Sequence, residues 1–180
     1  MPMVELKVCG TELPEPFVRE LETRITAVLR DTISTSFAVG LGWGPADPNH
    51  ALAKQTVERV MPGWTMVNVE QCRWAWGGER NGEVVVRLQT FVMEGAVSQE
   101  WRRAISTNLY ALMAEMFADA GDKLRIFNTC VEGEVTMYLP PAQFYGLLGE
   151  GETHKELDVP EIAEWMTARI KKNIEAGAVA

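Results

Sequence analysis

The stretch that decides the fold is MPMVELKV, residues 1–8, at the start of the chain. Its apolar side chains, from Val4 to Val8, alternate with the charged Glu5 and Lys7, which is the pattern of a half-buried β-strand. No basic segment and no apolar leader stands before this pattern, so we expect the chain to begin directly with structure.

Pro2 gives this strand a candidate catalytic group. Initiator methionine is generally removed before a residue as small as proline, which would leave Pro2 with a free secondary amine. A free α-amino group titrates at about 7.7–8.0 and burial disfavours its charged form, so such an amine can act as a base near neutral pH. If Met1 is retained, the Pro2 nitrogen is an amide without basicity, and Pro2 is simply the first residue of a strand.

The composition is that of one packed domain. The chain has 180 residues, of which 47% are hydrophobic and 23% charged, and a net charge of -8. This acidity argues against nucleic acid and anionic membrane surfaces as partners, and no apolar run is long enough to span a membrane. Three separated cysteines and two histidines form no metal-ligand pattern, so we expect no metal or other cofactor, free thiols and a cytoplasmic location.

Periodicity and turn signals predict alternating strands and helices. The predicted strands cover residues 1–8, 64–72, 84–93 and 124–131, with a short hairpin partner for the last of them at 135–139. Four helices are predicted. The first begins at 14–17 and ends within 33–44, and the second runs from 48 to about 60 before a stop at 61–63. The third begins after Ser98 and ends at 120–122, and the fourth runs from 160 to about 175.

The two main strand–helix segments repeat each other at a shift of 84 residues. Pro14 then falls on Ser98, and the apolar positions of the first helix fall on those of the second. Two β-α-β units of this kind predict an α+β fold, a four-stranded sheet with both helices on one face. We expect the other face to be apolar, with Val85, Phe91 and Ile126 on it, and therefore to be covered by a further copy of the chain.

Pro2 at the head of this duplicated pattern, together with FVMEG at residues 91–95 before the second helix, resembles the tautomerase superfamily. That group includes 4-oxalocrotonate tautomerase, macrophage migration inhibitory factor and cis-3-chloroacrylic acid dehalogenase. The resemblance covers residues 2–139, as units at about 2–72 and 84–139, and leaves 140–180 as an extension of the same domain. It implies a homotrimer and a small carbonyl or enol substrate, with Pro2 as general base or general acid in an isomerase or a related hydratase, dehalogenase or decarboxylase.

The chain departs from the family at the arginines that usually hold a substrate carboxylate. The corresponding turns carry Thr11 or Glu12 in the first unit and Met93 and Ala96 in the second, none of them cationic. Arg73 and Arg80 are the remaining candidates for this substrate-binding role, and each can equally be a solvated surface arginine.

Two polar side chains complete the candidate site. Asn128 lies on the fourth strand, where migration inhibitory factor also has an asparagine near its pocket, although it can instead satisfy backbone groups. Tyr138 can donate a hydrogen bond to a substrate oxygen or simply pack. Trp74 can wall a pocket or pack in the core.

Two other hypotheses stay open at this point. The missing arginines fit a catalytically inactive, tautomerase-like binding or structural module. The same order of elements also occurs in ferredoxin-like dimeric α/β barrels, in which the strands are antiparallel and Pro2 has no role.

Overall fold

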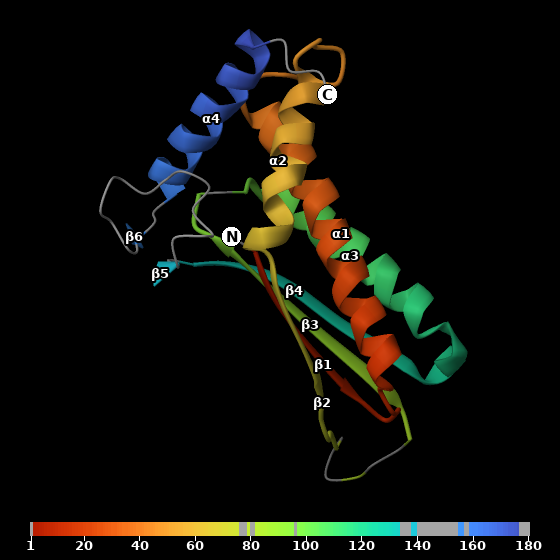
Figure 1. Ribbon diagram of the computed structural model, residues 1–180. Coiled ribbons are helices and arrows are strands. Elements are labelled where there is room, and N and C mark those ends of the chain that lie inside the picture. The colour runs from red at the N-terminus through yellow and green to blue at the C-terminus, as the bar shows by residue number, and fades with distance from the viewer. Residues whose placement is uncertain are drawn as a thin grey trace.

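The computed structural model describes residues 2–75, 79, 82–95, 97–133, 138–139, 155–156 and 159–176, some of them by their backbone alone. Its main sheet contains β1 (Met3–Cys9), β2 (Met66–Gln71), β3 (Val84–Met93) and β4 (Leu124–Gly133), in the order β2-β1-β3-β4. Figure 1 shows this sheet beneath the helices.

Strand directions reveal two β-α-β units joined side by side. β1 is parallel to β2, and β3 is parallel to β4, whereas the central pair, β1 and β3, is antiparallel. The predicted α+β fold with a four-stranded sheet is therefore confirmed. The ferredoxin-like alternative is wrong for this sheet, because the strands within each unit are adjacent and parallel.

The two long helices, α1 (Glu15–Gly40) and α3 (Gln99–Met116), lie side by side across one face of the sheet (Figure 1). Their N-caps are Pro14 and Ser98, as the repeat predicts, and the Ser98 hydroxyl accepts a hydrogen bond from the Trp101 N–H at 3.4 Å. Equivalent positions of both helices are buried against the sheet: Leu21, Ile25 and Leu29 in α1, and Ile105, Leu109 and Met113 in α3.

The sheet contributes alternate residues to this core. Val4, Leu6 and Val8 of β1 are fully buried beneath the helices, and Leu6 pairs directly with the equally buried Leu88 of β3. The alternation along residues 1–8 therefore reports which side of the strand faces the helices.

The opposite face of the sheet is not the apolar surface that the sequence predicts. Its central row is charged: Lys7 pairs with Glu70 of β2 and with Arg87 of β3, and the Lys7 amine lies 3.4 Å from the Glu70 carboxylate. Val85 and Phe91 lie on this face, as predicted. Ile126 does not, because it pairs with the buried Val86 and packs on the core beneath the helices.

Two further helices, one inserted between α1 and β2 and one in the C-terminal extension, form a second helical group. α2 (His50–Trp64) packs against α1, and α4 (Val159–Glu175) packs against α2 with Ile170 fully buried. The predicted stop at 61–63 is wrong, because Pro62 is accommodated inside α2, where it removes one backbone donor.

Short elements lie within and after the second unit. The 3-10 helix η1 (Ala118–Lys123) joins α3 to β4. β5 (Tyr138–Leu139) pairs with β6 (Lys155–Glu156). In the described residues β5 is thus not a hairpin partner of β4, which corrects the sequence prediction.

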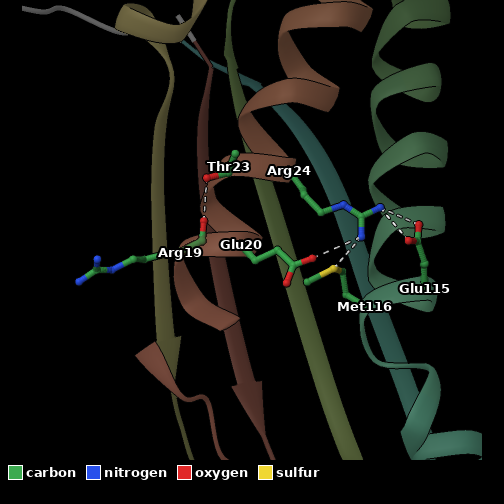
Figure 2. A network of polar contacts seen from close by, with 6 residues as sticks. All are labelled: Arg19, Glu20, Thr23, Arg24, Glu115 and Met116. Carbon is green, nitrogen blue, oxygen red and sulfur yellow. Dashed lines mark hydrogen bonds and ion pairs between the residues drawn. The ribbon is translucent and has the colours of Figure 1, made fainter. Parts of the chain in front are cut away.

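A polar network ties α1 to α3 on their outer side (Figure 2). The Arg24 guanidinium donates to both oxygens of Glu115 at 2.8 Å and to the sulfur of Met116 at 3.0 Å, and it also lies 3.9 Å from Glu20. This hydrogen bonding raises the pKa of Arg24 and lowers the pKa of Glu115. The charged groups of this network lie outside the core, whereas Met116 also packs against it.

Gly10, directly after β1, has a backbone that only glycine fits well. Its φ is +83°, and a Cβ at this position would lie 2.0 Å from the carbonyl oxygen of Glu83. We expect Gly10→Ala to destabilise the fold by more than the roughly 1–2 kcal/mol that a left-handed backbone costs, because backbone atoms must also move. Urea denaturation measures the loss.

Gly42→Ala is the matched control for this substitution. Gly42 has the same φ of +83°, but a Cβ there meets nothing within 4 Å. The two substitutions share the backbone penalty, so the clash at residue 10 is isolated by the difference between them. Equal losses of stability would contradict the close packing of Gly10 against Glu83.

Candidate functional site

Pro2 is buried where β1 begins, at the end of the sheet where β3 finishes. Its carbonyl oxygen accepts a hydrogen bond from the Met66 N–H at 3.1 Å, which joins Pro2 to the first residue of β2. The next residue, Met3, pairs with Met66 on one side and with Phe91 on the other. The position of Pro2 is therefore fixed by both neighbouring strands.

A guanidinium and a carboxylate lie at the same end of the sheet. The register that pairs Met3 with Phe91 places Pro2 opposite Val92, and Val92 pairs with Glu132 of β4. Glu132 accepts the Gly95 N–H at 2.8 Å and forms an ion pair with Arg102, from the first turns of α3. Two strand spacings of about 4.8 Å separate Pro2 from Glu132, a distance of roughly 10 Å.

Two further polar groups lie two residues before Val92 and Glu132 along the same strands. Cys130 and Thr90 are paired residues of β4 and β3. Burial raises the pKa of the Cys130 thiol, while the positive charge of Arg102 opposes this shift. The Thr90 hydroxyl is fully buried and has no hydrogen-bond partner in the described part of the chain.

Arg73 lies at the other end of the sheet. Val8, near the end of β1, pairs with Gln71, so Arg73 follows the far end of β2. At about 3.3 Å per residue, the seven residues of β1 separate this position from Pro2 by roughly 20 Å or more. One chain therefore does not bring Arg73 and Pro2 together.

Arg73 instead lines a cleft of about 390 Å³. Trp74 lies beside it, and its indole ring stacks on Phe127 of β4 with the ring centroids 6.4 Å apart. Of the two roles considered for Trp74, the wall of a pocket is therefore the one observed.

Asn128 is another predicted site residue, and its described side chain does not lie beside Pro2. Asn128 pairs with Leu88 in the middle of the sheet, and its amide donates to the Ser106 carbonyl of α3 at 2.5 Å. It therefore ties β4 to α3. Arg80 lies outside the described residues, and Tyr138 is described only by its backbone, in β5.

Arg102 and Glu132 are the charged pair that the sequence prediction missed. Arg102 lies in a helix that was predicted correctly, whereas Glu132 was expected just after the fourth strand and is part of β4. The relation of both residues to Pro2 depends on how the two units are joined. An antiparallel β1–β3 pair brings the end of the second unit to the start of the first. The sequence signal that could have found this pair is the repeat, because it makes β3 the counterpart of β1.

The described residues contain no group of three or more His, Cys, Asp or Glu side chains placed to hold a metal ion. No helix in the described part of the chain is both long and apolar enough to cross a membrane.

The sequence matches no protein-family model and no curated protein. Among solved structures, the chain is similar to Pt0534 inactivated by 2-oxo-3-pentynoate, with a TM-score of 0.49 and 12% identity over 73% of this chain and 85% of that one. It is also similar to Leishmania major MIF2, with a TM-score of 0.44 and 11% identity over 86% and 97% of the two chains. Native fused 4-OT gives a TM-score of 0.42 and 15% identity over 72% and 87%. The fold described above rests on the strand order and directions, independently of these similarities.

Proposed function

We propose that this chain is an isomerase or lyase of the tautomerase type, which uses Pro2 on a small carbonyl or enol compound with one carboxylate. The observation that carries this proposal is the place of Pro2, buried at the head of an inner strand of a duplicated β-α-β sheet. The Pro2 carbonyl is held by the Met66 N–H, and the next residue, Met3, is paired on both sides, so we expect the Pro2 amine, once Met1 is removed, to have a fixed direction.

The chemistry follows from a neutral secondary amine in a buried place. Pro2 takes a proton from the carbon next to a carbonyl group, and the proton is returned to the carbonyl oxygen, which converts the keto form to the enol. The reverse transfer, from the enol oxygen to that carbon, gives the keto form. In its protonated form, the same amine acts as a general acid in the addition of water or in the loss of a leaving group. Neither step requires a cofactor.

Arg102 is our candidate for the substrate carboxylate. It is ion-paired with Glu132, which lies on the row of Pro2. The separation of roughly 10 Å along this row is one that a three-carbon or four-carbon acid spans when reacting groups are about 3–3.5 Å from each end. Its guanidinium has five N–H donors, so the ion pair with Glu132 leaves donors for a substrate. Glu132, held by the Gly95 N–H, then keeps the guanidinium oriented.

We expect Arg102→Ala to raise KM for an α-keto acid such as phenylpyruvate by about 10- to 150-fold, the equivalent of roughly 1.5–3 kcal/mol for a charged hydrogen bond. Steady-state kinetics of the enol–keto isomerisation measure the change. Arg103→Ala is the matched control, since this neighbour on α3 is exposed, and it should leave KM unchanged.

Glu132→Gln separates substrate binding from the ion pair. It removes the negative charge but keeps the guanidinium and a side-chain oxygen that accepts from it, so KM should rise less with this variant than with Arg102→Ala. An unchanged KM in Arg102→Ala would contradict the role of Arg102 and return Arg73 or Arg80 as the cation.

Arg73 can act on the same substrate only if another copy of the chain brings it to Pro2. We propose a homotrimer, in which the open sheet face with its row of Lys7, Glu70 and Arg87 is covered by neighbouring copies. Arg80, Asn128 and Tyr138 keep their proposed substrate-binding roles. Light scattering should return the mass of a trimer, and a monomer would contradict this assembly.

The second candidate function is a binding module without activity. It is favoured by Met93, which is buried at the end of β3, where the resemblance implies an arginine. The two candidates differ in whether a free Pro2 amine accelerates isomerisation.

A further inference from the structure

Cys9 and Cys72 lie far apart in the sequence but are neighbours in the sheet. The Met66 N–H donates to the Pro2 carbonyl, and Met66 is paired with Met3. The Cys72 N–H donates in the same way to the Val8 carbonyl at 2.7 Å, so Cys72 is paired with Cys9. The pairing thus extends one residue beyond β2.

The two thiols share one side of the sheet and one hydrogen-bond donor residue. The backbone N–H of Trp74 donates to the Cys9 sulfur at 3.3 Å, and its indole N–H donates to the Cys72 sulfur at 2.9 Å. Neighbouring strands are about 4.8 Å apart, which is within the Cα separation of about 4.4–6.8 Å that a disulfide requires.

Both thiols are also accessible. Each is partly exposed, and both line the cleft of about 390 Å³ that also contains Arg73, Glu12 and Glu83. The Glu83 carboxylate is paired with Arg125 at 2.9 Å. Arg73 therefore places a cation in the lining of the same cleft as the thiol pair, which favours an anionic reagent.

We propose that Cys9 and Cys72 form a dithiol–disulfide pair that exchanges with small-molecule disulfides, of which glutathione disulfide is the probe used here. The thiolate of one cysteine attacks the disulfide, forms a mixed disulfide and releases one glutathione thiolate. The second thiolate then attacks the protein sulfur of the mixed disulfide and releases the other glutathione. The protein loses two electrons and two protons, and glutathione disulfide is reduced to two thiols. This site is separate from Pro2, at the opposite end of the sheet.

The test is peptide mapping of the folded protein after equilibration with glutathione and glutathione disulfide and alkylation of free thiols. We expect one disulfide-linked peptide pair containing Cys9 and Cys72, an intact mass lower by two hydrogens, and a free, alkylated Cys130. Cys130→Ser is the matched control and should give the same linked pair.

Cys72→Ser tests the second step of the exchange. This variant should retain a glutathione mixed disulfide on Cys9, because no neighbouring thiol displaces it. Alkylation of both Cys9 and Cys72 in the wild type under oxidising conditions would overturn the proposal. So would a stable mixed disulfide on Cys9 while Cys72 is intact. Both outcomes are read from the wild-type protein and do not depend on whether the variant folds.

Discussion

Pro2→Ala is expected to lower kcat/KM for the isomerisation of phenylpyruvate by about 10²-fold, the lower end of what a positioned general base contributes. The variant keeps an amine at the same place, but a primary one, and it loses the ring that fixes φ at the head of β1. In the wild type, kcat/KM should rise with pH as the amine becomes neutral, with an apparent pKa at or below the ordinary α-amino value of about 7.7–8.0.

Met3→Ala is the matched control for Pro2→Ala. Met3 follows Pro2 in the same strand but points to the open face, and its side chain is only partly buried. Circular dichroism should show an unchanged fold in both variants, while only Pro2→Ala loses activity. Equal activity of Pro2→Ala and the wild type at all pH values would contradict a role for the amine.

The second large effect is expected in the core. Ile25→Ala in α1 and Leu109→Ala in α3 each remove a fully buried side chain at equivalent positions of the two units. Each should lower the free energy of unfolding by about 2–5 kcal/mol, since transfer of the lost methyl groups and the cavity left behind both contribute. Urea denaturation measures the loss of stability in both variants. The protein concentration is kept fixed, because oligomerisation adds to apparent stability.

Thr107→Ala on the exposed side of α3 is the control and should change stability by less than about 0.5 kcal/mol. The repeat predicts similar losses at residues 25 and 109. A loss near that of the control at either position would mean that the two helices do not share one core.

Sequence reasoning succeeded where a local pattern was sufficient. Alternation along residues 1–8 and 84–93 placed β1 and β3, and Ser98 placed the start of α3, because the hydrogen bond to Trp101 is local. The repeat at 84 residues predicted both helices on one side of the sheet, since equivalent apolar positions require equivalent packing.

It was imprecise where another element decides what is buried. α1 ends at Gly40, inside the predicted range of 33–44, and its last turns contain Thr32, Ser34 and Ser36, which are small, polar and buried. These residues form no apolar stripe in the sequence. They are nevertheless buried, because α2 packs against α1. The end of α1 therefore depends on its packing against α2, which the local sequence of α1 does not show.

The site shows the same limit. Pro2 was predicted as the catalytic group from its place in the chain, but Arg73 was chosen as its partner because it follows β2. β2 runs parallel to β1, so its end lies away from Pro2. β3 is antiparallel to β1, so the end of the second unit, with Glu132 and its partner Arg102, lies at the same end of the sheet as Pro2. The cysteine pair was missed for a related reason: residues 9 and 72 become neighbours only through the β1–β2 register.

The most direct test of the central claim is the isomerisation rate of the Met1-processed protein beside that of the Met1-retained protein, with the state of each sample established by its intact mass. The account predicts activity for the processed protein and a larger loss in the Met1-retained protein than in Pro2→Ala, because an amide nitrogen has no usable lone pair. Equal rates in the two forms would contradict it and leave Pro2 as the first residue of a strand in a binding module.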